Sequence, residues 1–280
     1  MSHAYATSNL LAGLVASNIT PSTGPSDATR AYLFDGKMSR PFVFTAGTSP
    51  LTLVIDFGSA VTLLGMAMLN HNVKALGVAS PTFGVDAADN SGMSTNLVTV
   101  KAASAVPTTE PQEKDCVLQF AGNVSKRYWR LIFTWTGGGS YALQLGELYC
   151  YYAKTLLTRG STWGSGEGEE HRTAAVEFPN GEQEAVYFGG PLRETRLTFA
   201  DLNATALNEL RTLKNATRAQ TVPFLWIPSY EATATAAAAT EQDCIFGRVQ
   251  EAKWEWTQDD FGIYQPPQLR IRSRGREVGA

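Results

Sequence analysis

Histidine and cysteine, from which many catalytic and metal centres are built, are scarce in this sequence. Three of each occur among 280 residues, and neither type clusters. No HExxH or G-x-S-x-G pattern is present. Cys116, Cys150 and Cys244 lie in no CxxC spacing and form no even set, which predicts reduced, buried thiols rather than a disulfide framework. The sequence therefore predicts no catalytic residue, no metal site and no cofactor.

A strong net charge and long hydrophobic runs are also lacking. The net charge of -3 provides no general basic surface for nucleic acid, and the longest apolar segments are far too short to span a bilayer. Residues Leu10–Ala16 resemble the apolar part of a signal peptide, but no lysine or arginine precedes Arg30, so the charged leading region is missing. We therefore expect a folded strand at Leu10–Ala16, in a protein made in the cytoplasm.

The stretch from residue 197 to residue 228 predicts a strand, a helix and a second strand. Asp201 suits the N-cap of the helix, because its carboxylate can accept the free backbone N–H groups of the first turn. Apolar residues then recur at every third position from Leu207 to Leu213, which indicates one buried helical face. Phe224–Ile227 is a short apolar run typical of a buried strand. We expect a helix near residues 202–216.

The first half of the chain consists of repeated short strands and turns. Val61–Leu69 is apolar on both faces, which predicts a central strand between two layers. Arg127–Phe133 is a strong aromatic strand, and Tyr141–Tyr152 is another. Such closely spaced strands predict a β-sandwich. The Gly- and Ser-rich segment from residue 154 to 168 indicates a junction, so the predicted domains are residues 1–152 and 153–280.

The order of motifs in this half resembles the discoidin-like, galactose-binding family. Five short segments carry the resemblance: Val15–Ser17, Tyr32–Gly36, Ile55–Gly58, Arg127–Leu131 and Leu145–Leu148. The resemblance implies a jelly-roll β-sandwich over residues 1–152 whose tip loops bind glycans.

On that resemblance, His71, Trp135 and Tyr141 are the candidate glycan contacts. The two aromatic residues lie beside the glycine turn at Gly137–Gly139, where their rings can stack on a sugar face. The alternative is that these rings belong to the core and that His71 is a loop histidine with no binding role.

Two polar features of this half have structural interpretations. Arg127 or Arg130, on an otherwise apolar strand, is expected to meet a carboxylate such as Glu147. One acidic cluster is a candidate for binding a cation, and a structural turn is the favoured interpretation of it over a metal site. This cluster consists of Asp86, Asp89 and Asn90.

The second half predicts a β-sandwich or open barrel that carries one helix. Pro179–Gly181 is a hairpin turn signal between two strand patterns. With Pro223–Pro228 after the helix and Phe246–Val249 beyond it, the order of elements resembles the tube-and-distal-tail family of long-tailed bacteriophages. This resemblance implies a virion structural protein of the viral tail tip, a homo-oligomeric ring, expected to be a hexamer, that links the tail tube to the tip.

The same resemblance implies the partners and the location of the protein. The partners are further copies of the chain, the tail tube and tail hub proteins, and carbohydrate on the host cell surface. The protein would be made in the host cytoplasm and then belong to the tail of the virion.

Charged residues near the C-terminus are the candidate subunit interface of such a ring. Arg270, Arg272 and Arg274 alternate along the last strand, and Glu251 and Glu255 lie on a strand that can face a neighbour. Opposite charges across a rim fix register and suppress wrong pairings. The alternative is that the arginines only solvate an exposed strand.

Two other classes of function compete with the tail structure. A carbohydrate-binding lectin without an assembly role explains the first half and leaves the second half without a purpose. An enzyme requires a catalytic set, and the run of Glu167, Glu169 and Glu170 beside His171 is better interpreted as a solvated linker. We therefore expect a structural protein and no enzymatic activity.

Overall fold

The computed structural model describes residues 4–24, 27–106, 115–157, 166–170, 173–177, 183–187, 192–197, 199, 202–218, 221–227, 244–250, 257–258, 264–265 and 269–273. The chain divides into two compact units. The first unit holds the described residues from Ala4 to Thr155 together with Ile227 and Cys244, and the second unit holds the rest. The predicted boundary after residue 152 lies near this division, and separate folding of the two halves stays a prediction.

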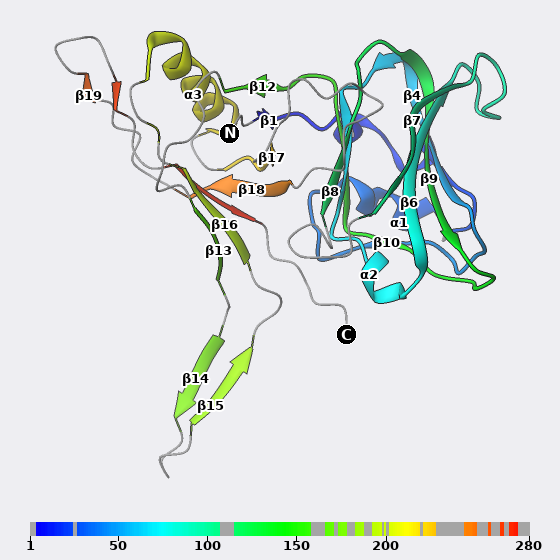
Figure 1. Ribbon diagram of the computed structural model, residues 1–280, viewed down its shortest axis with the longest axis horizontal. Coiled ribbons are helices and arrows are strands. Elements are labelled where there is room, and N and C mark those ends of the chain that lie inside the picture. The colour runs from blue at the N-terminus through cyan, green and yellow to red at the C-terminus, as the bar shows by residue number, and fades with distance from the viewer. Residues whose placement is uncertain are drawn as a thin grey trace. The chain divides into compact units, whose positions relative to one another are not determined.

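The first unit is built on two antiparallel sheets (Figure 1). The larger has the order β2 (Ile19–Pro21), β4 (Leu51–Thr62), β9 (Ser125–Thr136), β6 (Ala79–Ala88) and β7 (Val98–Ala105). The smaller has the order β11 (Glu147–Tyr151), β5 (Gly65–Leu69) and β8 (Cys116–Gln119). A short pair, β3 (Phe42–Val43) and β10 (Gln144–Leu145), adds a third ladder.

A single hydrophobic core lies between the two sheets. In β9 the buried residues alternate with half-buried ones from Trp129 to Trp135, and β4 alternates in the same way from Leu51 to Ile55. Met66 and Met68 of β5 face the same core from the smaller sheet. The prediction of a mainly β fold with a β-sandwich in the first half is therefore confirmed.

Strand β5 confirms the prediction of a central strand that is buried on both faces. All its residues from Gly65 to Leu69 are buried, and it pairs with β11 on one side and with β8 on the other. The predicted run was longer, because Val61 and Thr62 belong to the end of β4.

The strand expected at Leu10–Ala16 is not present. Leu10–Gly13 forms the 3-10 helix η1, and Ala16–Asn18 forms a second one, η2. The side chain of Asn9 accepts a hydrogen bond from the backbone N–H of Leu11, and this cap favours a helical turn over an extended strand. Three more short helices follow in the first unit: α1 (Asp27–Arg30), η3 (Ala31–Leu33) and α2 (Val73–Leu76).

A seven-stranded sheet takes most of its strands from the second half of the chain. Its order is β12 (Thr155–Leu156), β1 (Ala4–Ala6), β17 (Phe224–Ile227), β18 (Ile245–Val249), β21 (Leu269–Ser273), β16 (Leu192–Leu197) and β13 (Gly166–Glu170). Two hairpins accompany it, β14 (Thr173–Glu177) with β15 (Gln183–Tyr187) and β19 (Thr257–Gln258) with β20 (Tyr264–Gln265). The first of these hairpins is centred on the predicted turn at residues 179–181, which lies outside the described residues.

Helix α3 spans Ala204–Ala216 and confirms the predicted helix. Its buried face includes Leu207 and Leu213, as the three-residue spacing indicates. The N-cap prediction was wrong, because the side chain of Asn203 accepts the backbone N–H of Ala206 at 2.9 Å. The predicted cap, Asp201, lies outside the described residues.

Buried Glu147, at the start of β11, connects two segments that are distant in sequence. Its carboxylate accepts the backbone N–H of Gly36 at 2.9 Å and the amide of Asn9 at 3.5 Å. Both arginines of β9 meet a carboxylate, as expected, but that carboxylate is not Glu147. Arg127 pairs with Asp56 instead, and Arg130 pairs with Asp86.

Gly146, the residue before Glu147, packs tightly against the backbone of Met38 and the side chain of Asn70. A Cβ atom added there would lie 2.8 Å from the carbonyl oxygen of Met38 and 2.8 Å from the Cβ of Asn70. Asn70 is itself fixed, because its amide donates to the Met38 carbonyl at 3.0 Å. Only glycine fits this close approach without moving backbone.

Substitution of Gly146 by alanine is expected to lower the free energy of unfolding by about 1–3 kcal/mol, because the added methyl group overpacks a site bounded by backbone. Gly13→Ala is the matched control, since no atom lies within 4 Å of a Cβ built at Gly13. Chemical denaturation of both variants measures the difference. Equal stability of the two variants contradicts the close approach at Gly146.

Candidate functional site

One end of the sandwich is formed by three loops, residues 44–50, 70–78 and 136–146, and we call it the α2 end because α2 lies in the second loop (Figure 1). Gly47 and Tyr141 exchange backbone hydrogen bonds of 3.2 and 2.9 Å. The amide of Asn72 donates to the carbonyl of Ala142 at 3.1 Å and accepts the N–H of Gln144 at 2.8 Å. These bonds hold the three loops together.

The three predicted glycan contacts belong to one row of rings that runs to this end. The ring centroids of His71 and Phe83 are 5.9 Å apart, and those of Phe83 and Phe133 are 5.2 Å apart. Trp135 follows at 5.2 Å from Phe133, and Tyr141 at 5.6 Å from Trp135 in an edge-to-face arrangement. Such geometries are favourable between aromatic rings. The structure therefore brings His71, Trp135 and Tyr141 into one continuous chain of ring contacts.

Burial separates the members of this row. His71 is only 2% exposed and Trp135 only 6%, so the packing of the core accounts for both rings. Tyr141 is half-buried, and its ring packs directly on the backbone of Gly139, where a Cβ would overlap it. Tyr141 is thus the ring through which the row reaches solvent, and a glycan contact by the other two stays a prediction.

The indole of Trp135 carries an unusual polar group for a core residue. Its Nε1–H is buried and has no hydrogen-bond partner among the described residues. The other tryptophan of β9 differs, because Trp129 Nε1 donates to the carbonyl of Lys126 at 3.0 Å. A buried donor without a partner costs free energy, and such a group near a surface is suited to a ligand that brings an acceptor.

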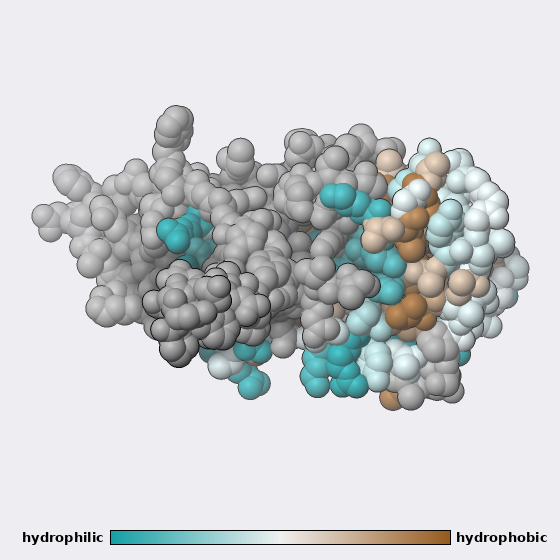
Figure 2. Space-filling model, turned by 90° about the horizontal axis from the view of Figure 1, so that it is seen from below, coloured by the Kyte–Doolittle hydropathy of each residue, from teal (hydrophilic) through white to brown (hydrophobic). Residues whose placement is uncertain are grey.

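The surface of the α2 end is open beside Tyr141. A Cβ built at Gly137 or at Gly138 would contact no atom within 4 Å, and both residues are exposed. Figure 2 views the first unit from the side on which α2 lies in Figure 1, and there residues of nearly neutral hydropathy surround a few apolar ones. This end therefore presents a ring and a small-residue loop rather than a charged cleft.

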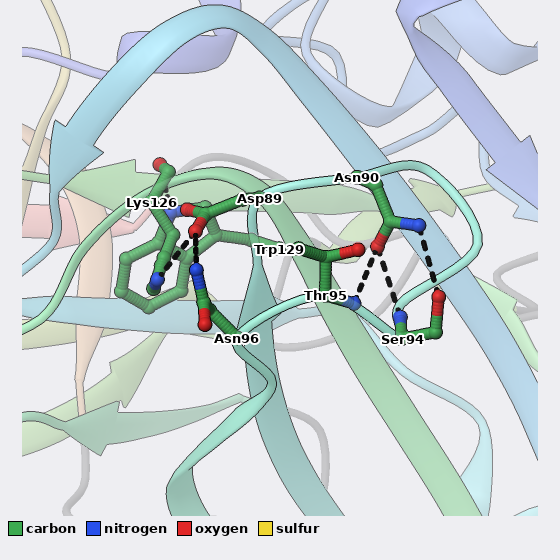
Figure 3. A network of polar contacts seen from close by, with 7 residues as sticks. All are labelled: Asp89, Asn90, Ser94, Thr95, Asn96, Lys126 and Trp129. Atoms are coloured by element: carbon green, nitrogen blue, oxygen red, sulfur yellow. Dashed lines mark hydrogen bonds and ion pairs between the residues drawn. The ribbon is translucent and has the colours of Figure 1, made fainter.

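The acidic cluster proposed as an alternative metal site lies at the opposite end of the sandwich, and its members turn to different partners. Asp89 accepts from the Asn96 amide at 2.7 Å and from Lys126 Nζ at 2.9 Å (Figure 3). The hydrogen bond from Asn96, supported by Lys126, holds the pKa of Asp89 below its ordinary value. Asp86 instead pairs with Arg130 at 2.6 Å.

The third member of that cluster, Asn90, closes the loop on itself. Its Oδ1 accepts the backbone N–H groups of Ser94 and Thr95, both at 2.9 Å, and its amide donates to Ser94 Oγ (Figure 3). In the part of the chain that the structure describes, no three His, Cys, Asp or Glu side chains gather as a metal site would require. The contacts of Asp89 and Asn90 are those of a turn, whereas Asp86 lies within strand β6.

Arg127 forms a two-point contact with Asp56 on the neighbouring strand β4. Its Nε and Nη2 lie 2.7 and 2.8 Å from the two carboxylate oxygens, and its guanidinium also lies 4.9 Å from the ring centroid of Tyr128. The hydrogen bond from Arg127 holds the pKa of Asp56 below its ordinary value. This pair joins β4 to β9.

In the second unit, the buried carboxylate of Glu194 determines where two arginines lie. Arg196 Nε donates to it at 2.7 Å, and Arg270 of the predicted interface forms an ion pair with it. Burial alone would raise the pKa of Glu194, but hydrogen bonds from Arg270 and Arg196 lower it below the ordinary value. Arg270 is therefore engaged within its own chain.

The cross-strand register places like charges opposite each other on this sheet. Arg196 faces Arg270 across β16 and β21, and Arg272 faces Arg248 across β21 and β18. Directly opposite like charges destabilise a sheet. We call Arg196, Arg248, Arg270 and Arg272 the arginine face. The other predicted interface residues, Arg274, Glu251 and Glu255, lie outside the described residues.

Among the described residues, the three cysteines form neither a disulfide nor part of a metal-type cluster. Cys116, Cys150 and Cys244 are buried and form no disulfide, as the sequence predicts. Burial raises the pKa of the Cys150 thiol far above its ordinary value, so this group stays protonated. Among the described residues, no helix is long and apolar enough to cross a membrane.

No protein-family model matches the chain, and no curated protein matches its sequence. Among solved structures, chitosan-binding module 1 of a chitosanase/glucanase from Paenibacillus sp. IK-5 is 21% identical and covers 51% of this chain and 98% of that chain, with a TM-score of 0.39. CpGH89CBM32-6, produced by Clostridium perfringens, is 12% identical over 52% of this chain and 100% of that chain, with a TM-score of 0.37.

A further similar structure is the CBM32 of AlyQ in complex with 4,5-unsaturated mannuronic acid, which is 18% identical over 48% of this chain and 94% of that chain, with a TM-score of 0.35. These TM-scores are too low for the structural similarity to support a conclusion about function.

The pair of Asp56 and Arg127 predicts a pH-dependent contribution to stability. Asp56→Asn is expected to lower the free energy of unfolding by about 0.5 kcal/mol at neutral pH, since the pair is partly solvated. Because the folded-state pKa of Asp56 is lowered, this contribution is present above the unfolded-state pKa of about 4 and is lost as the pH falls through the folded-state value.

Urea denaturation of the wild type and of Asp56→Asn at neutral and at acidic pH measures this difference. Arg127→Gln, alone and combined with Asp56→Asn, completes a double-mutant cycle that isolates the pair. A difference between wild type and Asp56→Asn that persists in acid contradicts the assignment.

Proposed function

We propose that the first unit binds carbohydrate at the α2 end. The observation that carries this proposal is the row of rings that reaches solvent at Tyr141, between the edge of Trp135 and the backbone of Gly139. A row anchored in the core holds its last ring rigidly, so little side-chain entropy is lost when a ligand packs on it.

The chemistry of this end suits a sugar. The C–H face of a pyranose packs on an aromatic ring, and its hydroxyl groups accept and donate hydrogen bonds. The small residues Gly137 and Gly138 leave space at the surface of this loop. Apolar rings with a few convergent polar groups are the usual composition of a small-molecule site.

We propose that the first unit binds carbohydrate without hydrolysing it. Hydrolysis of a glycosidic bond requires two carboxyl groups that flank it. Near the α2 end, the carboxylates are engaged: Glu147 accepts the N–H of Gly36, Asp115 accepts the N–H of Asn70, and Asp35 accepts the N–H of Lys37. These bonds give all three carboxylates structural roles.

Tyr141→Ala is expected to weaken glycan binding by about five- to thirtyfold, because loss of the exposed ring removes a stacking contact of about 1–2 kcal/mol. The control is Tyr152→Ala, since Tyr152 is the exposed tyrosine just beyond the other end of β11. A broad glycan array with the full chain identifies the sugar, and calorimetry then compares the variants. If no glycan binds the wild type, or if both variants bind equally, the proposal fails.

We propose a second function, assembly, for the second unit: that it joins further copies in a ring at the tail tip of a bacteriophage, with the tail tube and tail hub proteins as neighbours. The observation that favours it is the arginine face, where four arginines lie on three neighbouring strands and two of them, Arg196 and Arg270, pair with the buried carboxylate of Glu194. A facing acidic surface on a neighbouring subunit relieves this repulsion and fixes the register of a closed ring.

Arg248→Glu tests the arginine face with little risk to the fold. The new carboxylate stands opposite Arg272, so a like-charge pair becomes an opposite-charge pair within the chain. We expect a folded protein that no longer forms rings in negative-stain electron microscopy. Arg211→Glu, on the exposed surface of α3, is the control of equal charge change. Rings that survive Arg248→Glu contradict the proposed contact.

A further inference from the structure

The two edges of the five-stranded sheet differ in how well they are protected against pairing with another chain. Strand β2 is three residues long and ends in Pro21, which has no backbone N–H to donate. Strand β7 at the opposite edge is eight residues long and contains no proline. Within the described ranges, no further strand lies outside β2 or β7.

Strand β7 also lacks charged residues on its exposed surface. Its sequence is VTVKAASA, in which the single charged residue, Lys101, is only 4% exposed. Thr99, Ala102 and Ala103 are exposed, and none of them carries a charge. Its first residue, Val98, and the residue before it, Leu97, are among the most exposed large apolar residues described, at 37% and 45%.

Proteins protect long sheet edges because unpaired backbone N–H and C=O groups form a template for another strand. The usual devices are short length, proline, outward charges and bulges. Strand β7 has only the last of these, two register shifts in its pairing with β6 between Phe83 and Asp86. A long, uncharged edge of this kind is suited to strand addition.

We propose that β7 pairs in an antiparallel arrangement with β7 of a second copy of this chain. A two-fold axis places a strand opposite itself, so a charged edge would repel its own copy, whereas the uncharged exposed side chains of β7 are compatible with themselves. The small side chains of Ala102 and Ala103 permit close approach. The contact would join two five-stranded sheets into one of ten strands, and it does not depend on either proposed function.

Sedimentation of the full chain over a wide range of concentration tests the pairing. We expect a reversible dimer whose dissociation constant rises about tenfold or more in the double variant Thr99→Lys with Ala103→Lys, because like charges meet across the two-fold axis. The control is Ala12→Lys with Thr20→Lys, which adds the same charge at exposed positions, Thr20 being on the protected edge β2. The control should dimerise like the wild type.

If the β7 variant misfolds, hydrogen exchange of the wild-type protein still tests the pairing. Backbone amides of β7 should gain protection as concentration rises, while those of β2 should not. A wild type that stays monomeric, a dimer insensitive to the β7 lysines, or β7 amides with the same protection at all concentrations would each overturn the proposal. Rings that form through the arginine face are lost with Arg248→Glu and not with the β7 lysines, so the two contacts remain distinguishable.

Discussion

Burial of the inward face of β9 is the interaction on which the first unit depends. Trp129, Leu131, Phe133 and Trp135 alternate along one face of this strand and pack against both sheets. Each such side chain contributes roughly 1.5–3 kcal/mol on leaving water. Because β9 is the middle strand of the larger sheet, its position also sets those of β4 and β6. The ring of Tyr141 takes its place from the end of this same strand.

Two ion pairs also join β9 to the strands on either side of it. Arg127 pairs with Asp56 on β4, and Arg130 pairs with Asp86 on β6, so one strand forms ion pairs with both neighbours. A one-residue slip of the register would turn the tryptophans to solvent and break both pairs at once. Packing and electrostatics therefore specify the same register.

Local patterns in the sequence predicted those elements that local physics determines. The alternation in β9, the two-sided apolar run of β5 and the leucine spacing of α3 each follow from the period of the element, and the structure confirms them. Competing caps were not separable, since Asp201 and Asn203 both suit the start of a helix. For the segment after Asn9, an apolar composition indicated a strand, whereas a side-chain hydrogen bond favours a turn.

Partners across the sheets could not be predicted, because register between distant segments is not a local property. Glu147 was matched with an arginine of β9 on the basis of charge, but it lies at the other end of the sandwich and binds a glycine N–H. The row from His71 to Tyr141 joins two loops and two strands, so the sequence indicated three of its members, His71, Trp135 and Tyr141, without their order or burial. Single residues could be predicted, but their neighbours could not.

The hydrogen bonds of Asn9 have a consequence for how the first unit folds. Asn9 accepts the N–H of Cys150 and donates to the carbonyl of Leu148, so its partners are 141 and 139 residues away along the chain. Contacts of such long range close large loops before they return any stabilisation, which slows folding. On a ribosome, the sandwich cannot close before β11 has emerged. Until then, the apolar surfaces of β4 and β5 must remain without their final cover.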